Sequence, residues 1–291
     1  LDHPAKKRNL DQLRFADYCD KSAFLRQLTG SRLAQADCIF HLGANSSTTE
    51  TDENALFENN FMYTRQLCEW SLEKNVRFIY ASSAATYGDG SLGYSDDDGI
   101  TPTLQPLNPY GRSKQLFDLW ALDTGAIRHI AGLKYFNVYG PGEDHKGEMR
   151  SLVNKAYSQI ITEGEVRLFK SYKTGYGDGE QERDFVYVDD AVDVTLFFFD
   201  QRKVSGLFNC GTGRARTWND LAKALFLALS RQPRIRFVEM PEAIQERYQY
   251  HTKADLAKLR RSGYRQSFLD IEEGVRRYVK GYLEGMKESL R

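Results

Sequence analysis

The sequence contains no apolar run that approaches the ~20 residues needed for a membrane-spanning helix. Residues 1–8 lack the apolar core of a secretory signal. An excess of charge is also missing, because 40 basic residues balance 40 acidic residues in a chain of 291. These absences argue against membrane insertion, export and electrostatic attraction to nucleic acid. We therefore expect a cytoplasmic protein with neither a membrane nor a nucleic acid as its partner.

Cysteine is scarce, and its four copies, Cys19, Cys38, Cys68 and Cys210, lie far apart without the spacing of metal ligands. We interpret them as the reduced thiols of a cytoplasmic protein. The three adjacent aspartates at positions 96–98 could form a metal site, but we favour a solvated loop. We expect no metal in this protein.

What the chain does contain is an alternation of strand and helix patterns. Short apolar runs of the strand type occupy residues 37–44, 76–81, 130–137 and 206–210, and helical patterns separate them. This order predicts parallel βαβ units and a doubly wound, Rossmann-like α/β sheet. Such sheets bind ligands at the carboxyl ends of their strands. Four polar residues fall at or just after these ends: Ser46, Ser83, Tyr110 and Asn137.

The stretch Tyr110-Gly-Arg-Ser-Lys114 is the centre of the predicted site. Asn108 can cap a helix and Pro109 suits its first turn, so Tyr110 and Lys114 should share one helix face. A nearby ammonium ion makes a phenol easier to ionise. Such a tyrosine can take a proton from an alcohol while a hydride leaves the same carbon. By itself, this spacing is also typical of a helix edge with a solvated lysine.

These residues, with Ser83 after an apolar strand as the group that holds the hydroxyl, resemble the extended short-chain dehydrogenase/reductase family of sugar-nucleotide epimerases and dehydratases. The resemblance covers nearly all of the chain. It implies a dinucleotide-binding domain from residues 1–137 and about 187–213. It also implies a smaller α/β substrate-binding domain from about 138–186 and 214–291.

Further motifs narrow the resemblance to the ADP-L-glycero-D-manno-heptose 6-epimerases. They are Tyr135-Phe-Asn-Val-Tyr-Gly-Pro141, His145-Lys-Gly147, Ser47-Thr-Thr-Glu50, Ala81-Ser-Ser-Ala-Ala-Thr-Tyr-Gly88 and Arg247-Tyr-Gln249. The resemblance implies an ADP-heptose substrate, lipopolysaccharide-core precursor synthesis and a homo-oligomer. It implies NADP as the cofactor in preference to NAD.

Inversion of a hydroxyl-bearing carbon needs no net redox change, because hydride can leave one face and return to the other. One tyrosine serves both directions if the ketone rotates; otherwise one acid/base group must stand on each face. From spacing alone, Lys146 would be a surface lysine in a polar loop. The resemblance implies that Tyr110 and Lys146 are the two acid/base groups and that Ser83 and Lys114 complete the catalytic set.

The resemblance also supplies binding residues. Cofactor contacts are expected at Lys6, Lys21, Leu42, Gly43, Ala44, Asn45, Ser46, Asn59, Lys114, Val138 and Lys146. Substrate contacts are expected at Ser83, Asn137, Glu148, Lys155, Phe169, Lys170, Ser171, Tyr172, Arg183 and Tyr248.

Arg183 suits a diphosphate, because a guanidinium binds it bidentately. The alternative is a surface ion pair with Asp184 or Glu182. Glu148 and Lys155 depart from the small hydroxyl residue and the histidine that the family often has, and the loop 173–181 is longer than in some members.

The chain shows no G-x-x-G-x-x-G turn, which in this family receives the cofactor pyrophosphate at a helix N-terminus. Leu1 matches a point just beyond the second strand of the family. We expect the parent protein to continue upstream, and the 291-residue chain alone to fold loosely and bind NADP feebly. Gly211-Thr-Gly213 is no replacement, since it precedes a helix capped by Thr217 and has the pattern of a structural turn.

Two other functions stay open. A UDP-hexose 4-epimerase would not need Lys146, and a 4,6-dehydratase would need Asp-Glu where this chain has Ala84-Ala85. A non-catalytic remnant of the family would explain the missing glycine turn. The intact Ser83, Tyr110, Lys114 and Lys146 argue against the remnant.

Overall fold

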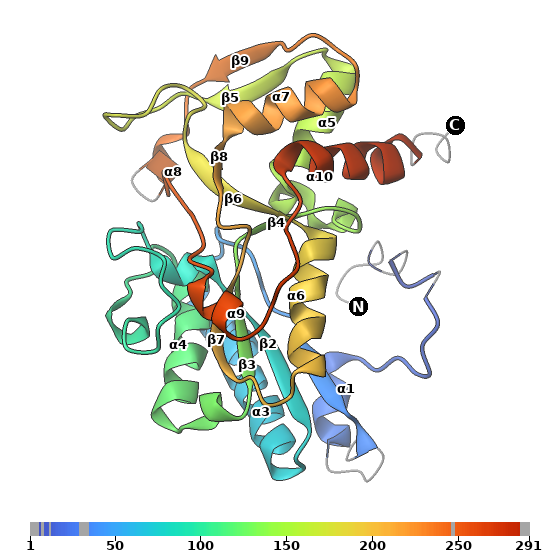
Figure 1. Ribbon diagram of the computed structural model, residues 1–291, viewed down its shortest axis with the longest axis vertical. Coiled ribbons are helices and arrows are strands. Elements are labelled where there is room, and N and C mark those ends of the chain that lie inside the picture. Colours follow the sequence, from blue (N-terminus) through green and yellow to red (C-terminus); the bar gives the residue numbers. More distant parts are fainter. Residues whose placement is uncertain (1–5, 7–8, 12, 29–34, 246–247, 286–291) are drawn as a thin grey trace.

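The computed structural model describes residues 6, 9–11, 13–28, 35–245 and 248–285. Arg247 of the predicted motif lies outside these residues. A four-stranded parallel sheet with helices forms the lower part of Figure 1, and two small sheets with their helices form the upper part. None of the helices in the described part of the chain has both the length and the apolar character to cross a bilayer.

The four-stranded sheet has the order β1-β2-β3-β7, and all its neighbouring strands are parallel. Three predicted apolar runs contain one of these strands and the run 76–81 overlaps β2, which confirms the predicted α/β class. The strands are β1 (Cys38–His41), β2 (Arg77–Ser83), β3 (Ala131–Tyr135) and β7 (Gly206–Cys210). All five residues of β7 are buried, as expected for a parallel strand covered on both faces.

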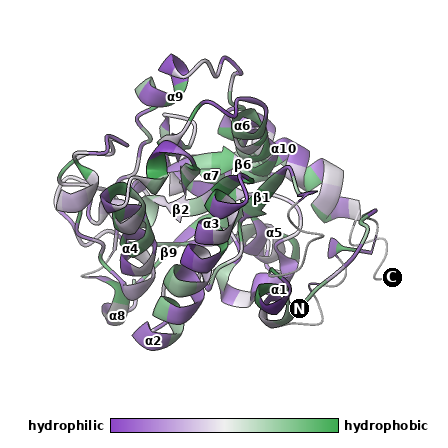
Figure 2. Ribbon diagram, turned by 90° about the horizontal axis from the view of Figure 1, so that it is seen from below, coloured by the Kyte–Doolittle hydropathy of each residue, from purple (hydrophilic) through white to green (hydrophobic). Residues whose placement is uncertain are grey.

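Helices cover both faces because the side chains of β2 alternate. Phe78 and Tyr80 pack with α3 (Tyr63–Glu73) and α4 (Pro109–Asp123), whereas Ile79 packs in the cluster of α6 (Val188–Asp200). Figure 2 shows hydrophobic residues gathered along the central strands and the helix faces beside them. This two-sided packing is the doubly wound arrangement that the sequence predicts.

A π-helical segment, Phe57–Met62, separates α2 (Glu53–Leu56) from α3. It contains the pair Asn59 and Asn60. π-Helical turns inside α-helices are rare and are frequent at functional sites. Here the turn buries Asn60 beside α4.

The upper part of the molecule contains β4, β6 and β8 in one small sheet and the parallel pair β5–β9 in another. Their core joins three helices, α5 (Leu152–Thr162), α7 (Trp218–Ala228) and α10 (Ile271–Tyr278), through side chains such as Val153, Leu225 and Val275. β6 was not among the strands that the pattern predicts, and the division into two domains stays a prediction. The strands are β4 (Asn137–Tyr139), β5 (Val166–Phe169), β6 (Glu182–Tyr187), β8 (Ala215–Thr217) and β9 (Ile235–Val238).

The remaining helices complete the described chain. They are α1 (Lys21–Gln27), α5 (Leu152–Thr162), α7 (Trp218–Ala228), α8 (Glu242–Gln245), α9 (Ala257–Arg261), α10 (Ile271–Tyr278) and a π-helical turn at Val279–Leu283. Short 3-10 segments lie at Ala84–Tyr87, Thr101–Thr103, Ala126–Arg128 and Asp144–Met149.

Candidate active site

Helix α4 presents Tyr110 and Lys114 to the carboxyl end of β2. The Asn108 side chain accepts a hydrogen bond from the Gly111 amide at 2.8 Å and caps the helix, as predicted. Gly111 is required there, because a Cβ atom would lie 2.8 Å from the carbonyl oxygen of Ala85. The absence of a side chain thus lets the first turn of α4 approach the segment that follows Ser83.

A cavity of about 190 Å³ opens at this point. It lies at the carboxyl ends of β2 and β3, where the fold class predicts a ligand. Three of the four polar residues predicted at strand ends line it, whereas Ser46 does not. The lining residues are Thr48, Ser83, Ala84, Ala85, Gly88, Leu107, Asn108, Tyr110, Tyr135, Phe136, Asn137 and Gln249.

Burial governs the ionisation of the two central groups. It raises the pKa of Tyr110, while a hydrogen bond with Ser83 opposes that rise. It lowers the pKa of Lys114 to about 8, while the Asp118 carboxylate opposes that fall. We expected Lys114 to make Tyr110 easier to ionise, but in this structure Ser83 is the group that stabilises the phenolate. The Lys114 ammonium instead donates to the Ala81 carbonyl at 2.8 Å.

Asn60 joins the predicted cofactor loop, residues 42–46, to α4. Its Nδ2 donates to the Asn45 carbonyl and to Ser113 Oγ, both at 2.9 Å. Its Oδ1 accepts from the Asn45 amide at 2.8 Å. The side chain is 1 % exposed, so the π-helical turn places a satisfied, buried amide between two parts of the site.

The other predicted cofactor contacts lie around this loop. Leu42, Gly43 and Ser46 are exposed, while Ala44 and Asn45 are half-buried. Lys21 Nζ donates to Asn59 Oδ1, so the structure brings these two predicted contacts together. Lys6 and Val138 are each half-buried, in the N-terminal segment and in β4 respectively.

Lys146 stands apart from the cavity. It lies exposed on the 3-10 segment Asp144–Met149, and it does not line the cavity with Tyr110. Gly147, the next residue, has a φ of 54°. The structure therefore leaves the second predicted acid/base group in solvent, and its role stays a prediction.

The turn that carries Lys146 is fixed from both sides. Glu143 accepts from the Ser151 amide and hydroxyl, both at 2.6 Å, and from the Tyr278 hydroxyl at 3.0 Å. Glu148 follows in the turn, and its carbonyl accepts from Lys155 Nζ at 3.0 Å. The two predicted substrate contacts that depart from the family pattern thus contact each other.

Arg183 is buried between aromatic rings. Its guanidinium lies 5.1 Å from the centre of the Tyr248 ring and 5.5 Å from that of Trp218, and it donates to the Glu182 carbonyl at 2.8 Å. Burial lowers the pKa of Arg183. Among the described residues no carboxylate forms an ion pair with this guanidinium. A buried cation without a counter-ion favours the binding of an anionic group.

The alternative role of Arg183, a surface ion pair with Asp184 or Glu182, is wrong: the residue is buried, no such pair forms among the described residues, and Asp184 is engaged elsewhere. Its carboxylate accepts from the amides of Thr212 at 2.7 Å, Gly213 at 2.8 Å and Ala254 at 3.0 Å. An internal carboxylate thus occupies the amide groups of the Gly211-Thr-Gly213 turn. The structure confirms that this turn is structural.

The remaining predicted substrate contacts lie on the loop after β5. Lys170 Nζ is 2.5 Å from a Glu239 carboxylate oxygen, and the Tyr172 hydroxyl donates to the same carboxylate. Ser171 donates its amide to Asp178 Oδ1 at 2.8 Å. Phe169 ends β5 and is half-buried. This loop is therefore held by contacts with Glu239 and Asp178.

Among the lining residues that the sequence did not assign to the site, Thr48 and Gln249 both stand in motifs that carry the resemblance. Thr48 belongs to Ser47-Thr-Thr-Glu50. Gln249 ends the other motif, and its side chain donates to the Gly88 carbonyl at 2.6 Å. The motifs were the available signal, but spacing along the chain does not show which of their members face the cavity.

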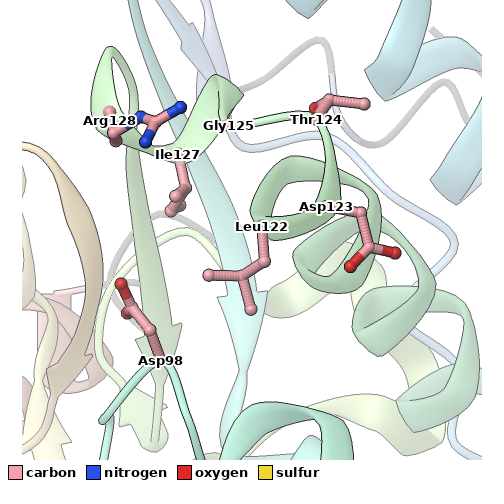
Figure 3. A pocket seen from close by; sticks show the side chains of 7 residues that line it. All are labelled: Asp98, Leu122, Asp123, Thr124, Gly125, Ile127 and Arg128. Carbon is pink, nitrogen blue, oxygen red and sulfur yellow. The ribbon is translucent and has the colours of Figure 1, made fainter.

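A second hollow, of about 420 Å³, lies at the opposite end of α4 and contains none of the predicted site residues (Figure 3). Asp98, Asp123 and Arg128 are among the residues that line it. Asp98 pairs with Lys258 at 2.9 Å, and the buried Asp96 accepts from the Asn209 amide at 2.8 Å. The adjacent aspartates thus anchor their loop. No group of three potential metal ligands gathers in the described part of the chain.

Comparison with known proteins places this site in a family. Residues 1–211 match the NAD dependent epimerase/dehydratase family. An ADP-L-glycero-D-manno-heptose-6-epimerase of Nitratidesulfovibrio vulgaris is 51% identical over 279 residues, which cover 96% of this chain and 86% of that protein. Its counterpart in Fusobacterium nucleatum is 46% identical over 94% of this chain and 86% of that protein.

A solved structure agrees with these relatives. The crystal structure of the Helicobacter pylori ADP-L-glycero-D-manno-heptose-6-epimerase matches with a TM-score of 0.73 and 28% identity, over 90% of this chain and 77% of that one. The family match extends over most of the chain and includes every strand of the four-stranded sheet. The chain therefore belongs to the NAD dependent epimerase/dehydratase family, and within it to the epimerases, which are isomerases.

Proposed function

We propose that this chain converts ADP-D-glycero-D-manno-heptose into ADP-L-glycero-D-manno-heptose by inversion at C6. The observation that carries the proposal is the convergence of Ser83, Tyr110 and Asn137 on one cavity, with the buried Lys114 behind it. Two relatives named ADP-L-glycero-D-manno-heptose-6-epimerase are 51% and 46% identical to the chain.

The residues present fit the reactive end of a nicotinamide cofactor. Lys114 is a buried ammonium with a carbonyl partner, and the exposed loop 42–46 leads to the same place. Asn60 holds that loop against α4. When bound, the cofactor supplies the chemistry of accepting a hydride and returning it. We assign NADP in preference to NAD, with Lys6 as the contact for the extra phosphate.

Tyr110 carries the proton on one face of the sugar carbon. Ser83 hydrogen-bonds the substrate hydroxyl and stabilises the Tyr110 oxygen when its proton leaves. Lys114 maintains a positive charge beside the reacting oxygen. These residues lie on α4 and at the end of β2, so little rearrangement is needed for this half of the reaction.

Lys146 carries the proton on the opposite face. Its exposed position requires the turn Asp144–Met149 to approach the cavity when substrate binds. The Glu143 and Ser151 contacts fix the two ends of that turn and leave Lys146 between them. The alternative mechanism, in which Tyr110 serves both faces of a rotating ketone, needs no such approach.

Arg183 binds the substrate diphosphate. Its rings, Tyr248 and Trp218, belong to the same region as Gln249, which lines the cavity. Further substrate contacts are assigned to Asn137, Glu148, Lys155 and residues 169–172. The proposal includes a cytoplasmic homo-oligomer that acts in lipopolysaccharide-core precursor synthesis; these features rest on the resemblance to the heptose epimerases.

Proton NMR of the sugar product tests the proposal. The protein should convert ADP-D-glycero-D-manno-heptose in the presence of NADP and leave UDP-galactose unchanged. Conversion of UDP-galactose instead would make the chain a hexose 4-epimerase. A folded protein that binds nucleotide but converts neither sugar would contradict the catalytic assignment. Tyr110→Phe, measured beside the wild type, excludes a contaminating epimerase.

A further inference from the structure

An ion pair lies fully buried beneath the candidate active site. Asp118 Oδ2 and Lys134 Nζ are 3.2 Å apart, and both side chains are 0% exposed. Asp118 lies on α4, one turn after Lys114 and two turns after Tyr110. Lys134 lies on β3, where it is the register partner of Ser82 in β2. The pair therefore joins the catalytic helix to the sheet below the cavity.

The Asp118 carboxylate fixes β2 against α4. It accepts from the Tyr80 hydroxyl at 2.8 Å and from the Ser82 hydroxyl at 2.7 Å. These two residues flank Ala81, whose carbonyl accepts from Lys114 at 2.8 Å. The position of the Lys114 ammonium thus depends on strand atoms that Asp118 holds.

Lys134 extends the same network to the Ser83 side of the cavity. Its ammonium donates to Thr86 Oγ1 at 2.8 Å and lies 4.9 Å from the centre of the Tyr87 ring. Thr86 and Tyr87 belong to the 3-10 segment that Ser83 caps. The pair consequently contacts both segments whose relative position brings Ser83 and Tyr110 together.

Stability alone does not explain this pair. Removing two charges from water costs energy that their attraction seldom repays, and apolar replacement of a buried ion pair is often neutral or stabilising. In contrast, an anion in a buried site favours the charged form of a nearby ammonium ion. The pair therefore has an electrostatic consequence for Lys114 that an apolar pair of the same shape would lack.

The titratable groups around Lys114 come from several elements. Tyr110 and Asp118 share its helix, and His41 comes from β1; the Asp118 carboxylate also contacts Tyr80 of β2 and Lys134 of β3. Burial holds the pKa of His41 to about 3, so its ring is neutral. The tyrosines are buried phenols, and burial raises the pKa of each. Among the described groups that face Lys114, Asp118 is the one anion.

We propose that Asp118 and Lys134 are positioning residues for Lys114: the Asp118 carboxylate places a negative charge near the ammonium and fixes β2 against it, and Lys134 holds that carboxylate in place. The proposal rests on the function given above, in which Lys114 supplies a positive charge at the reacting oxygen.

The first experiment measures the ionisation of Lys114 directly. The protein is labelled with ¹³Cε-lysine, the Lys114 signal is assigned from its absence in Lys114→Met, and its shift is followed with pH. In the wild type it should titrate at about 8. Asp118→Asn removes the anion and leaves Lys134 charged, so the pKa of Lys114 should fall by about one unit. The alkaline limit of epimerase turnover should move to lower pH by the same amount.

A second variant protects against loss of the fold. Asp118→Asn alone leaves Lys134 unpaired in the interior, which destabilises proteins strongly. Asp118→Asn with Lys134→Met removes both charges, and the pKa of Lys114 should still fall because Asp118 is the group that raises it. Arg77→Met is the control: it removes buried hydrogen bonds at the other end of β2 and should leave Lys114 unchanged.

The outcomes separate this inference from the proposed function. An unchanged Lys114 pKa in folded Asp118 variants overturns the inference, even if the wild type is an active epimerase. Loss of the fold in both variants shows that the pair serves stability and overturns it equally. A shifted Lys114 in a protein without epimerase activity supports the inference and contradicts the assigned reaction, because the titration needs neither cofactor nor substrate.

Discussion

Tyr110 and Lys146 are proposed to exchange protons with opposite faces of one carbon, yet their surroundings differ. Tyr110 lies half-buried on a 15-residue capped helix, beside Ser83. Lys146 lies exposed on a six-residue 3-10 segment, next to a glycine with a φ of 54°. The Tyr110 half of the site is assembled by the sheet and its helices. The Lys146 half depends on one turn and the contacts at its ends.

This difference means that substrate binding has a different task in each half of the site. Around Tyr110 the proposed catalytic groups already lie close together, which is the preorganisation that makes proton transfer efficient. Around Lys146 the substrate must complete the arrangement. Variants in the Tyr110 half should therefore affect proton transfer itself, whereas variants near Lys146 should affect how the site assembles around the substrate.

The largest effect is expected from Tyr110→Phe. Loss of a general acid/base group should lower kcat by ~10²–10⁴-fold. The melting temperature should hardly change, because the phenyl ring keeps its packing. Tyr157→Phe is the matched control, since its hydroxyl bonds the Leu283 carbonyl far from the cavity. Turnover within a few-fold of wild type in Tyr110→Phe would contradict the role of Tyr110.

The loop that follows Ser83 should give the protein a pH-dependent stability through Asp96. Burial raises the pKa of this carboxyl from 3.8 to about 6, and the residue is 3 % exposed. Because the folded pKa lies above the unfolded one, the stabilising contribution is full below pH 3.8 and is lost as pH rises through about 6. The loss amounts to about 3 kcal/mol in the free energy of unfolding.

Asp96→Asn should remove that dependence, so denaturant unfolding at pH 5 and pH 8 should give more similar free energies than in the wild type. Asp98→Asn, a change at a half-exposed neighbour, should retain the wild-type dependence. If the free energy of unfolding changes equally between pH 5 and pH 8 in the wild type and in Asp96→Asn, Asp96 is not buried as described.

Arg183→Ala tests the proposed contact with the substrate diphosphate, on which both halves of the site depend. A charged hydrogen bond contributes roughly 1.5–3 kcal/mol, so affinity for the ADP-sugar should fall by ~10–100-fold while affinity for cofactor changes little. Calorimetry with each ligand measures both. Arg167→Ala, on an exposed ion pair with Glu163, is the control. Unchanged ADP-sugar affinity in Arg183→Ala would refute the diphosphate assignment.

The smallest effect is expected from Tyr278→Phe, which loosens the turn of Lys146. The Tyr278 hydroxyl bonds Glu143 at 3.0 Å and Asn154 at 2.9 Å, so its removal should cost ~1–2 kcal/mol of stability. Epimerisation should fall by a few-fold, while cofactor binding should stay at the wild-type level. If turnover per folded molecule is unchanged, the contacts at the ends of the turn do not serve Lys146.

The Tyr110 half was predictable because its signals are local. Asn108 caps the helix that begins at Pro109, and the four-residue spacing places Tyr110 and Lys114 on one face. The apolar runs likewise predict the four strands of the main sheet. At these positions the local sequence preferences agree with the packing of the whole fold, so the sequence alone was sufficient to predict the helix and the strands.

Elsewhere the decisive contacts join distant parts of the chain. In the sequence, Asp118 is indistinguishable from a solvated polar residue of a helix. Its burial becomes evident only in the fold, which brings Lys134 to it from β3. The guanidinium of Arg183 packs against the rings of Trp218 and Tyr248, which lie far from it along the chain. β6 was missed because Arg183 and Asp184 interrupt its apolar pattern; both are buried through tertiary contacts that spacing does not reveal.

The central claim is that the exposed Lys146 works with the buried Tyr110, and turnover of Lys146→Met tests it most directly. Conversion of ADP-D-glycero-D-manno-heptose is followed by NMR in the wild type, Lys146→Met and Lys74→Met, the last an exposed lysine paired with Glu73 at 2.7 Å. We predict that Lys146→Met loses ~10²-fold or more in turnover with its fold intact, and that Lys74→Met matches the wild type. Near-wild-type turnover in Lys146→Met would contradict the two-group mechanism and assign both faces to Tyr110.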